Sequence, residues 1–431
     1  MAITARVGVL ALLGVLVVAF ALPSWTGVLT VLTALVLLVM LDVVLAGGVR
    51  GLVFQRGKGV AARLGEPIEA TLTVTNPGRR PVRGVLRDAW PPSAGAENER
   101  HPIRLGPGQR HTVVTRLRPV RRGERQAARI TVRSVGPLGL AARQASHRVP
   151  GAVRVLPPFH SRKHLPARLD RLRRLDGRQA ALVRGEGTEF DSLREYVIGD
   201  DVRSIDWRAT ARARDVMVRT WRPERDRHLL LVLDTGRTSA GRVGDAPRLD
   251  AAMEAALLLA AVAARAGDRV DLIAYDRRLR AKVSGATGAE LLPALSTALA
   301  PLEPSLVETD ARGLAGEVLR RARQRSLVVL LTGLEAPAVE EGLLPVLPGL
   351  LARHRLLVGA VADPAVAEMA RGRGSAEAVY GAAAAERSLA ERRQVAAVLA
   401  RRGVDVVDAL PEELPPALTD RYLTLKATGG F

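Results

Sequence analysis

LLLVLD, residues 229–234, is the stretch that decides the fold, because it is a continuous apolar run of strand length. RLDAAMEAALLLAAVAARAG follows at 248–267 with a helical pattern that ends in Gly, and RVDLIAYD at 269–276 has strand length again. The same alternation predicts strands at 326–333, 355–363 and 404–410, and helices near 289–300, 311–324, 337–353 and up to about 402. Apolar strands that alternate with helices predict an α/β doubly wound domain with a parallel sheet over residues 228–431.

Hydroxyl and carboxylate side chains lie at the ends of these strands. LDTGRTSAG places Asp234 and Thr238 after the first strand, and VETDARG places Thr309 before a helix. In open parallel sheets, ligands bind at the carboxyl ends of the strands. Oxygen side chains gathered there suit Mg²⁺, the one cofactor that the sequence suggests. The alternative is that Asp234 and Thr238 cap the next helix or hold the loop by hydrogen bonds.

Two apolar runs at residues 7–46 predict an N-terminal transmembrane helical hairpin over residues 1–50. The second run is long enough to cross about 30 Å of hydrocarbon, whereas the first is marginal alone. The turn Pro23-Ser24-Trp25-Thr26 joins them. A signal peptide is the competing interpretation of the first run, but the segment that follows is apolar again rather than polar.

Positive charges predict the orientation of this hairpin. Arg6 precedes it, Arg50, Arg56 and Lys58 follow it, and its loop has none, so both ends are expected in the cytoplasm. The net charge of +20 favours an anionic partner, and anionic inner-leaflet lipid is the expected one. The alternative cause of the charge is a codon preference for Arg. Asp42 in the second run is expected to reach the membrane interface rather than to act within the membrane.

Residues 51–158 contain short runs of alternating hydrophobicity, such as PIEATLTVTN and HTVVTRLRP, separated by Gly- and Pro-rich turns. This pattern predicts antiparallel strands and a small β-sandwich of the immunoglobulin or fibronectin kind. The segment has no clustered His or acid pair. We therefore interpret it as an interaction or spacer module.

The connecting segment, residues 159–227, contains GTEFDSLREYVIGDDVRSIDWRATARARD at 187–215, where acids and arginines alternate around three aromatic side chains. We consider it an interdomain clamp or a partner-docking surface. A catalytic site on Glu186, Glu189 and Asp191 is a third alternative without a visible nucleophile or oxyanion donors. The candidate docking residues are Glu189, Phe190, Arg194, Tyr196, Gly199, Asp200, Asp201, Arg203, Asp206, Trp207 and Arg212.

This segment carries a resemblance to a known family. The pattern GEGxEFxxLREYxxGDDxRxIDWxxxAR is matched from Gly185 to Arg212, and with VGPLGL at 135–140 and the C-terminal stretch it resembles the bacterial domain-of-unknown-function family 58. The resemblance covers nearly the whole chain. It implies a membrane anchor, a β-sandwich and a von Willebrand factor A-like domain. It also implies a MoxR-type AAA+ ATPase and client proteins as partners, with no enzymatic activity.

Von Willebrand A domains commonly hold a metal-ion-dependent adhesion site, and the resemblance places its ligands at Asp234, Thr238 and Thr309. Gly236 and Gly333 stand where two further oxygen ligands are usual, so the implied metal site is degenerate. Each missing ligand must be replaced by water, which weakens Mg²⁺ binding.

Several function classes fit the sequence less well. Absence of Cys excludes thiol nucleophiles and disulfides, and no GxSxG, HExxH or Walker sequence is present. A hydrolase that uses the strand-end acids remains the enzymatic alternative. A nucleic-acid-binding protein is suggested by the charge, but the scarcity of aromatic residues and the membrane hairpin disfavour it. We expect a non-enzymatic, membrane-anchored adaptor or scaffold.

Overall fold

The computed structural model describes residues 2–57, 59–182, 189–198, 200–213, 215–222 and 227–429. The chain forms two compact units, Met1–Leu156 and Pro157–Phe431. It is a multidomain protein with an apolar helix near its N-terminus and several sheets, which confirms the coarse part of the predicted fold class.

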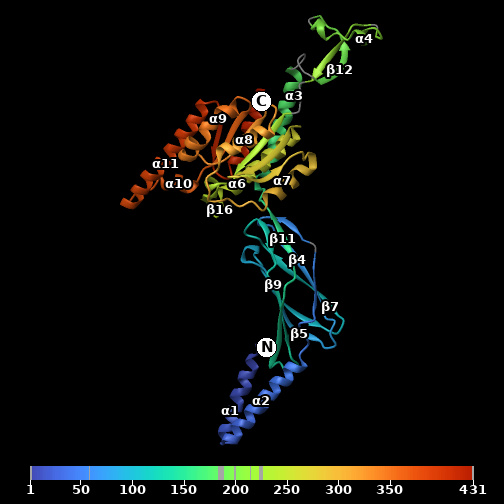
Figure 1. The fold of residues 1–431 in the computed structure, drawn as a ribbon, viewed down its shortest axis with the longest axis vertical. Coiled ribbons are helices and arrows are strands. Elements are labelled where there is room, and N and C mark those ends of the chain that lie inside the picture. Colours follow the sequence, from blue (N-terminus) through green and yellow to red (C-terminus); the bar gives the residue numbers. More distant parts are fainter. Residues whose placement is uncertain are drawn as a thin grey trace. The chain divides into compact units, whose positions relative to one another are not determined.

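Two apolar helices open the first unit: α1 (Ala5–Phe20) and α2 (Trp25–Leu45). They pack against each other and are joined by a short turn (Figure 1). Ser24 caps α2 by accepting a hydrogen bond from the Gly27 N–H. Within the described residues, α2 is the helix long and apolar enough to span a membrane, and α1 is shorter. Most of their Leu and Val side chains are exposed.

The rest of the first unit consists of β-sheets. One five-stranded sheet has the order β1-β10-β9-β5-β6, and two three-stranded sheets have the orders β2-β4-β7 and β3-β11-β8. Along β4 buried and more exposed residues alternate, as expected for a sheet with one face in the core. The strands are β1 (Ala2–Ile3), β2 (Val53–Arg56), β3 (Ala61–Arg63), β4 (Ile68–Thr75), β5 (Val82–Ala89), β6 (Arg100–Leu105), β7 (Arg110–Leu117), β8 (Gly123–Gln126), β9 (Arg129–Val135), β10 (Ala141–His147) and β11 (Ala152–Leu156).

The helix α2 is fastened to this sheet structure by Asp42. This residue is fully buried, and its carboxylate accepts hydrogen bonds from the backbone N–H groups of Leu138, Leu140 and Ala141 at 2.7, 2.7 and 2.8 Å. These amides belong to the loop between β9 and β10, which contains VGPLGL. The place of Asp42 at the membrane interface stays a prediction, and the structure adds that its partners there are protein amides. Its charge is stabilised by three backbone dipoles instead of water.

Arg56 is one of the positive charges after the hairpin from which the orientation is predicted, but its side chain does not face solvent. Its guanidinium pairs with Asp88 inside the unit, with both side chains almost completely buried. Arg50, in contrast, is exposed. Only Arg50 of these two positive charges is therefore available to a membrane surface.

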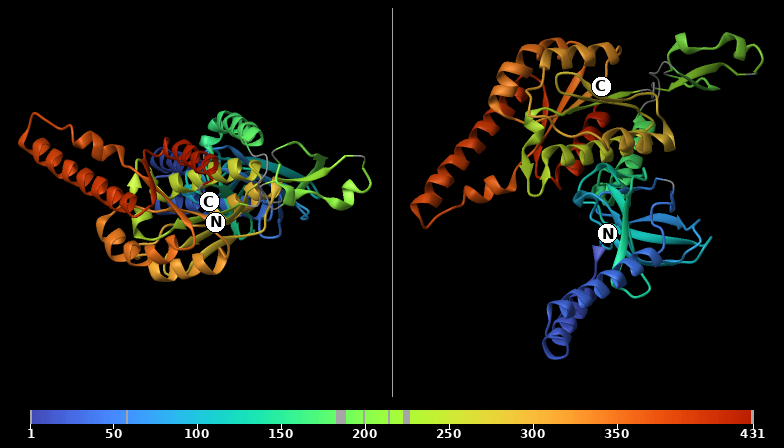
Figure 2. Two further views of the ribbon diagram at one scale, coloured as in Figure 1. Left: turned by 90° about the horizontal axis from the view of Figure 1, so that it is seen from above. Right: turned by 60° about the horizontal axis from the view of Figure 1, so that its bottom comes forward.

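The second unit contains a six-stranded sheet with the order β18-β17-β14-β19-β20-β21. Five strands are parallel, and the edge strand β18 is antiparallel to β17. Helices cover both faces of this sheet (Figures 1 and 2). The strands are β14 (His228–Asp234), β17 (Arg269–Tyr275), β18 (Leu279–Val283), β19 (Leu327–Leu331), β20 (Arg355–Val361) and β21 (Asp405–Ala409).

Both faces of the sheet are buried, because alternate residues of β14 enter two different cores. Leu229, Leu231 and Leu233 pack in the core under α6, α7 and α12, whereas Leu230 and Val232 pack in the core under α8 and α9. The helices are α3 (Leu165–Leu182), α5 (Arg237–Ala240), α6 (Arg248–Arg265), α7 (Leu291–Leu299), α8 (Ala311–Arg321), α9 (Leu344–Leu351), α10 (Pro364–Met369), α11 (Ala376–Arg401) and α12 (Leu414–Ala427).

Three local features depart from the sequence interpretation. The predicted helix at 337–353 begins as a π-helix, η5 (Ala338–Leu343), before α9. The Ala-rich stretch at 370–393, which we expect to be a loop that leads into a helix, is already helical from Ala376 in the long helix α11, which extends beyond the sheet with α10 (Figure 2). Helix α3 packs on α6 and places Leu172 in the α/β core, so the second unit already begins at Pro157.

The connecting segment that carries the family pattern forms a separate two-stranded antiparallel sheet of β12 (Glu189–Glu195) and β13 (Met217–Arg222). Between these strands lie the short turn η3 (Val202–Ser204) and the one-turn helix α4 (Trp207–Thr210). We call residues 189–222 the motif hairpin.

Candidate functional site

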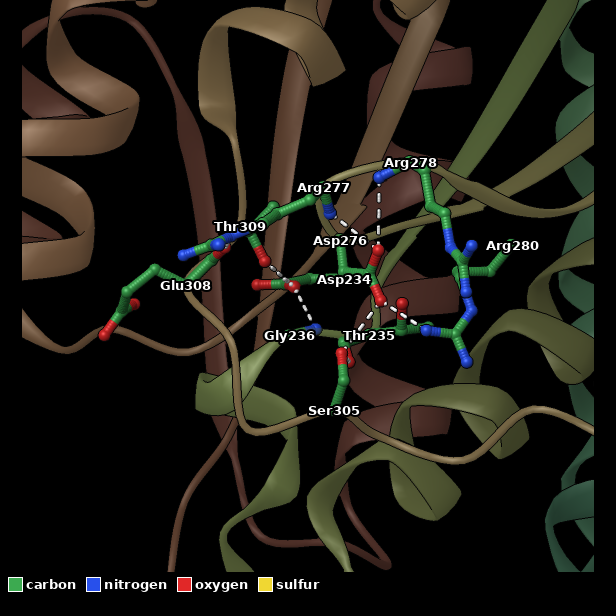
Figure 3. Close-up of polar contacts among 10 residues, drawn as sticks. All are labelled: Asp234, Thr235, Gly236, Asp276, Arg277, Arg278, Arg280, Ser305, Glu308 and Thr309. Carbon is green, nitrogen blue, oxygen red and sulfur yellow. Dashed lines mark hydrogen bonds and ion pairs between the residues drawn. The ribbon is translucent and has the colours of Figure 1, made fainter.

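Asp234 at the carboxyl end of β14 is the centre of the first candidate site. Its Oδ1 accepts hydrogen bonds from the Gly236 N–H at 2.8 Å and the Thr309 hydroxyl at 2.5 Å. Its Oδ2 accepts from the hydroxyls of Thr238 at 2.8 Å and Thr332 at 2.5 Å. The predicted trio of Asp234, Thr238 and Thr309 is thus brought together, and Thr332 is a further hydrogen-bond donor to Asp234. Figure 3 shows Asp234 with its partners Gly236 and Thr309.

This geometry does not fit an octahedral Mg²⁺. A carboxylate has about four lone-pair positions, and four neutral donors use those of Asp234. A Cβ at Gly236 would overlap the Thr309 hydroxyl, so a serine ligand has no room there. A Cβ at Gly333 would overlap the Glu335 carboxylate, which pairs with Arg248. Within the described chain, no group of three or more His, Cys, Asp or Glu side chains is placed to hold a metal ion.

A second acid, Asp276, follows the neighbouring strand β17. It is buried and accepts hydrogen bonds from the Ser305 hydroxyl, from the N–H groups of Arg277 and Arg278, and from the Arg280 guanidinium (Figure 3). Burial raises the pKa of Asp276, but these hydrogen bonds outweigh burial and leave the pKa below its ordinary value. Both strand-end acids are therefore engaged in holding loops by hydrogen bonds.

A cleft of about 310 Å³ opens beside Asp234. It lies between the start of α8 and the π-helix η5, at the carboxyl ends of β14 and β19. Parallel sheets bind their ligands at this edge. The cleft was not predicted from the sequence, because it depends on how η5 packs.

The motif hairpin is the second candidate site, and its acids shape its own backbone. Asp200 accepts hydrogen bonds from the Arg194 guanidinium at 2.6 Å and from the Val197 N–H at 3.0 Å. The Arg194 hydrogen bond, followed by that of the Val197 amide, lowers the pKa of Asp200. Asp201 caps η3 through the Arg203 N–H at 3.0 Å.

Asp206 has the same kind of role further along. It caps α4 by accepting from the N–H groups of Arg208 and Ala209, at 2.9 and 3.0 Å, and it pairs with Arg219 on β13 at 2.8 Å. The Ala209 amide and then Arg219 lower its pKa. The ion-pair partner of Asp206 is thus Arg219, and Arg208 contributes only its backbone. Asp206 thus links α4 to β13 within the hairpin through its cap and its ion pair.

The apolar side chains of the motif hairpin are largely exposed. Ile198 is 96% exposed and Trp207 is 68% exposed, and Tyr196, Val197 and Val202 are exposed as well. Trp207 therefore does not cover an apolar surface of its own chain. Glu189 and Phe190 lie on β12, but their side chains lie outside what the structure describes, as does Gly199. Arg203 and Arg212 are exposed as well.

A serine–histidine–aspartate arrangement occurs at the opposite, amino edge of the parallel sheet. His228 Nδ1 lies 2.8 Å from the Ser326 hydroxyl, and His228 Nε2 lies 2.9 Å from Asp271. The Ser326 hydroxyl also lies 2.8 Å from the Gln324 carbonyl, to which it donates. Ser326 is fully buried, so a substrate does not reach it. The arrangement joins three strands and is structural, and sequence reasoning missed it because its members lie 43 to 98 residues apart.

His354, which precedes β20, is buried, and neither of its ring nitrogens has a hydrogen-bond partner in the described structure. Burial, followed by the neighbouring His228 and Arg353, lowers its pKa below the ordinary 6.5. At pH values between this lowered pKa and 6.5, His354 binds a proton in the unfolded chain but not in the folded chain. Stability therefore falls as the pH drops through this window.

We expect His354→Leu to reduce this pH dependence, by up to about 1.4 kcal/mol per pH unit. Hydrogen exchange of the β20 amides between pH 8 and pH 5.5 measures the effect. His160→Leu, which changes an exposed histidine of the same unit, is the control and should leave the pH dependence as it is. An unchanged slope in His354→Leu would contradict the assignment.

The fold and the two sites define a class: a multidomain protein with an apolar N-terminal helix, a β-sheet unit and an α/β unit that carries an oxygen-rich strand edge and a motif hairpin. The chain belongs to the family described as "Protein of unknown function DUF58", whose sequence model matches residues 192–415. The family resemblance noted from the sequence is thereby confirmed.

Two curated relatives are uncharacterized proteins of Mycobacterium bovis and Mycobacterium tuberculosis. Each is 26% identical over 197 residues, which is 45% of this chain and 61% of the relative. The chain thus spans about three fifths of the length of these relatives. A solved structure of trypsin-activated alpha-2-macroglobulin from Escherichia coli matches 36% of this chain and 9% of its own at 13% identity, with a TM-score of 0.20.

Proposed function

We propose that this protein is a non-enzymatic, membrane-anchored adaptor that captures a protein partner through the motif hairpin. The observation that carries the proposal is the exposure of the hairpin's apolar side chains, of which Ile198 and Trp207 are the most exposed. Exposed aromatic and aliphatic side chains beside arginines are typical of the energetically dominant part of protein interfaces. A two-stranded hairpin is only marginally stable alone, so a covering partner would stabilise it.

The anchor part of the proposal rests on α1 and α2. Their exposed apolar surfaces suit lipid, and we propose that they form a two-helix hairpin with both ends in the cytoplasm. Arg6 and the exposed Arg50 support this orientation. Anionic inner-leaflet lipid would then lie next to Arg50.

The α/β unit supports a von Willebrand factor A-like assignment by its parallel sheet and by the acid and hydroxyls at the end of β14. The partner implied by the family resemblance is a MoxR-type AAA+ ATPase, together with its client proteins. The engaged state of Asp234 and Asp276, and the burial of Ser326, favour the adaptor over the hydrolase alternative.

We expect Trp207→Ala to abolish partner capture without lowering the thermal unfolding temperature, because Trp207 is mostly exposed. The experiment is affinity capture of the full-length protein from native membranes in mild detergent, with co-purifying proteins identified and quantified. Tyr380→Ala on α11 is the matched control, since Tyr380 is an aromatic that is 78% exposed elsewhere in the same unit.

An AAA+ ATPase that is lost in Trp207→Ala and retained in Tyr380→Ala supports the proposal. Capture that survives Trp207→Ala and fails in Tyr380→Ala would move the docking surface to α11. A wild-type protein that brings down no ATPase would remove the proposed partner. A lowered unfolding temperature in Trp207→Ala would favour the clamp interpretation instead.

A further inference from the structure

The cleft beside Asp234 has an apolar wall. Its volume of about 310 Å³ is enough for one long side chain of a partner but small for a folded segment. Its lining contains five large apolar or proline side chains from α8, β19 and the region of η5: Leu314, Leu330, Pro337, Val339 and Leu343.

The charged residues of the lining are all acidic. They are Asp234, Glu308 and Glu341. Glu308 is paired with Arg237, which lies outside the lining, at 2.5 Å, so Glu341 is the acid of the outer cleft with no ion pair among the described residues. The four hydrogen-bond donors to Asp234 are neutral groups, so they stabilise its negative charge without cancelling it. An apolar wall with this potential complements a cation that has an aliphatic stem.

The π-helix η5 supplies Glu341 to this cleft. π-Helices have unfavourable geometry and occur frequently at functional sites. Glu340, next to it on the same helix, is equally acidic and exposed but does not line the cleft. Adjacent residues of a helix point in different directions, so only one of these two acids borders the cleft.

We propose that this cleft binds a lysine or arginine side chain of a polypeptide partner. The aliphatic stem lies along Leu314 and Leu343, and the cationic head lies beside Glu341, because Glu308 already pairs with Arg237. The ligand chemistry is the reverse of a metal-dependent adhesion site, where a bound cation captures a carboxylate. This contact is separate from the motif hairpin and does not depend on the adaptor proposal.

The chain's own charge makes this binding distinctive. With a net charge of +20, the protein as a whole repels basic peptides and attracts acidic ones without specificity. Preference for a basic peptide must then arise from a local acidic surface. Because Glu341 is exposed, salt should weaken this contact as well as the overall field.

The test uses the full-length protein in detergent and a fluorescently labelled peptide of sequence ALRLA, with blocked ends. Two further peptides carry citrulline or glutamate in place of the arginine. Fluorescence anisotropy should show binding of the arginine peptide, weaker binding of the citrulline peptide and weakest binding of the glutamate peptide. EDTA should leave these affinities unchanged, because no metal takes part.

Glu341→Gln is expected to weaken binding of the arginine peptide by about fivefold, the effect of one partly exposed charge-assisted hydrogen bond. Glu340→Gln makes the same charge change beside the cleft and should alter the affinity less than about twofold. No binding of the arginine peptide, equal binding of the citrulline peptide, or equal effects of the two variants would overturn the proposal. Mg²⁺-dependent binding of the glutamate peptide would also overturn it.

Discussion

Asp42→Ala is expected to release the β9–β10 loop from α2 and to destabilise the unit Met1–Leu156 by about 3–5 kcal/mol. The wild-type carboxylate accepts three backbone N–H groups at 2.7 to 2.8 Å and is fully buried. Alanine leaves two buried donors, the amides of Leu140 and Ala141, and the part-buried Leu138 amide without an acceptor, and each buried donor costs about 1–3 kcal/mol. Thermal unfolding in detergent and hydrogen exchange of the Leu138, Leu140 and Ala141 amides measure the loss.

Two variants sharpen this experiment. Leu41→Ala removes a half-exposed side chain from the same helical turn and should cost less than about 1 kcal/mol. Gly136→Ala adds a Cβ that would overlap the Asp42 carboxylate, so it should loosen the same loop with the acid still present. Unaltered exchange of the three amides in Asp42→Ala would show that the loop is held in another way.

The sequence pattern predicted the elements of the α/β unit well, because its strands are buried on both faces. LLLVLD has no polar residue before Asp234, so strand length and composition alone identify β14. The end of that strand could then be assigned to the carboxyl edge, which correctly grouped Asp234, Thr238 and Thr309. Local sequence pattern and sheet topology are therefore sufficient to predict the strands and the residues grouped at their carboxyl ends.

Contacts between distant segments were not predictable in this way. Asp42 was judged from its place in an apolar run, whereas its role depends on a loop 96 to 99 residues away. The pairing of Asp206 with Arg219 depends on the register of β12 against β13. The π-turn in η5 has no local sequence signature, so the cleft that it borders was missed as well.

Asp234→Ala is expected to destabilise the α/β unit by about 3–5 kcal/mol and to do so equally with Mg²⁺ or with EDTA. The variant leaves the hydroxyls of Thr238, Thr309 and Thr332 and the Gly236 amide without their common acceptor. Asp363→Ala is the matched control. Asp363 follows β20 and only caps α10, so its loss should cost about 1 kcal/mol.

The metal question is decided by the wild-type protein and by Gly236→Ser. If no metal binds, the thermal unfolding midpoint of the wild type is the same in Mg²⁺ and in EDTA. If Mg²⁺ binds, a concentration one hundred times its Kd would raise the free energy of unfolding by about 2.7 kcal/mol. Gly236→Ser restores a ligand type of the adhesion motif, but its side chain would overlap Thr309, so it should destabilise the unit. A midpoint that rises with Mg²⁺ in the wild type and not in Asp234→Ala would establish a metal site. The opposite result makes Asp234 a hydroxyl-bonded anchor that keeps the strand edge, and the cleft beside it, in place.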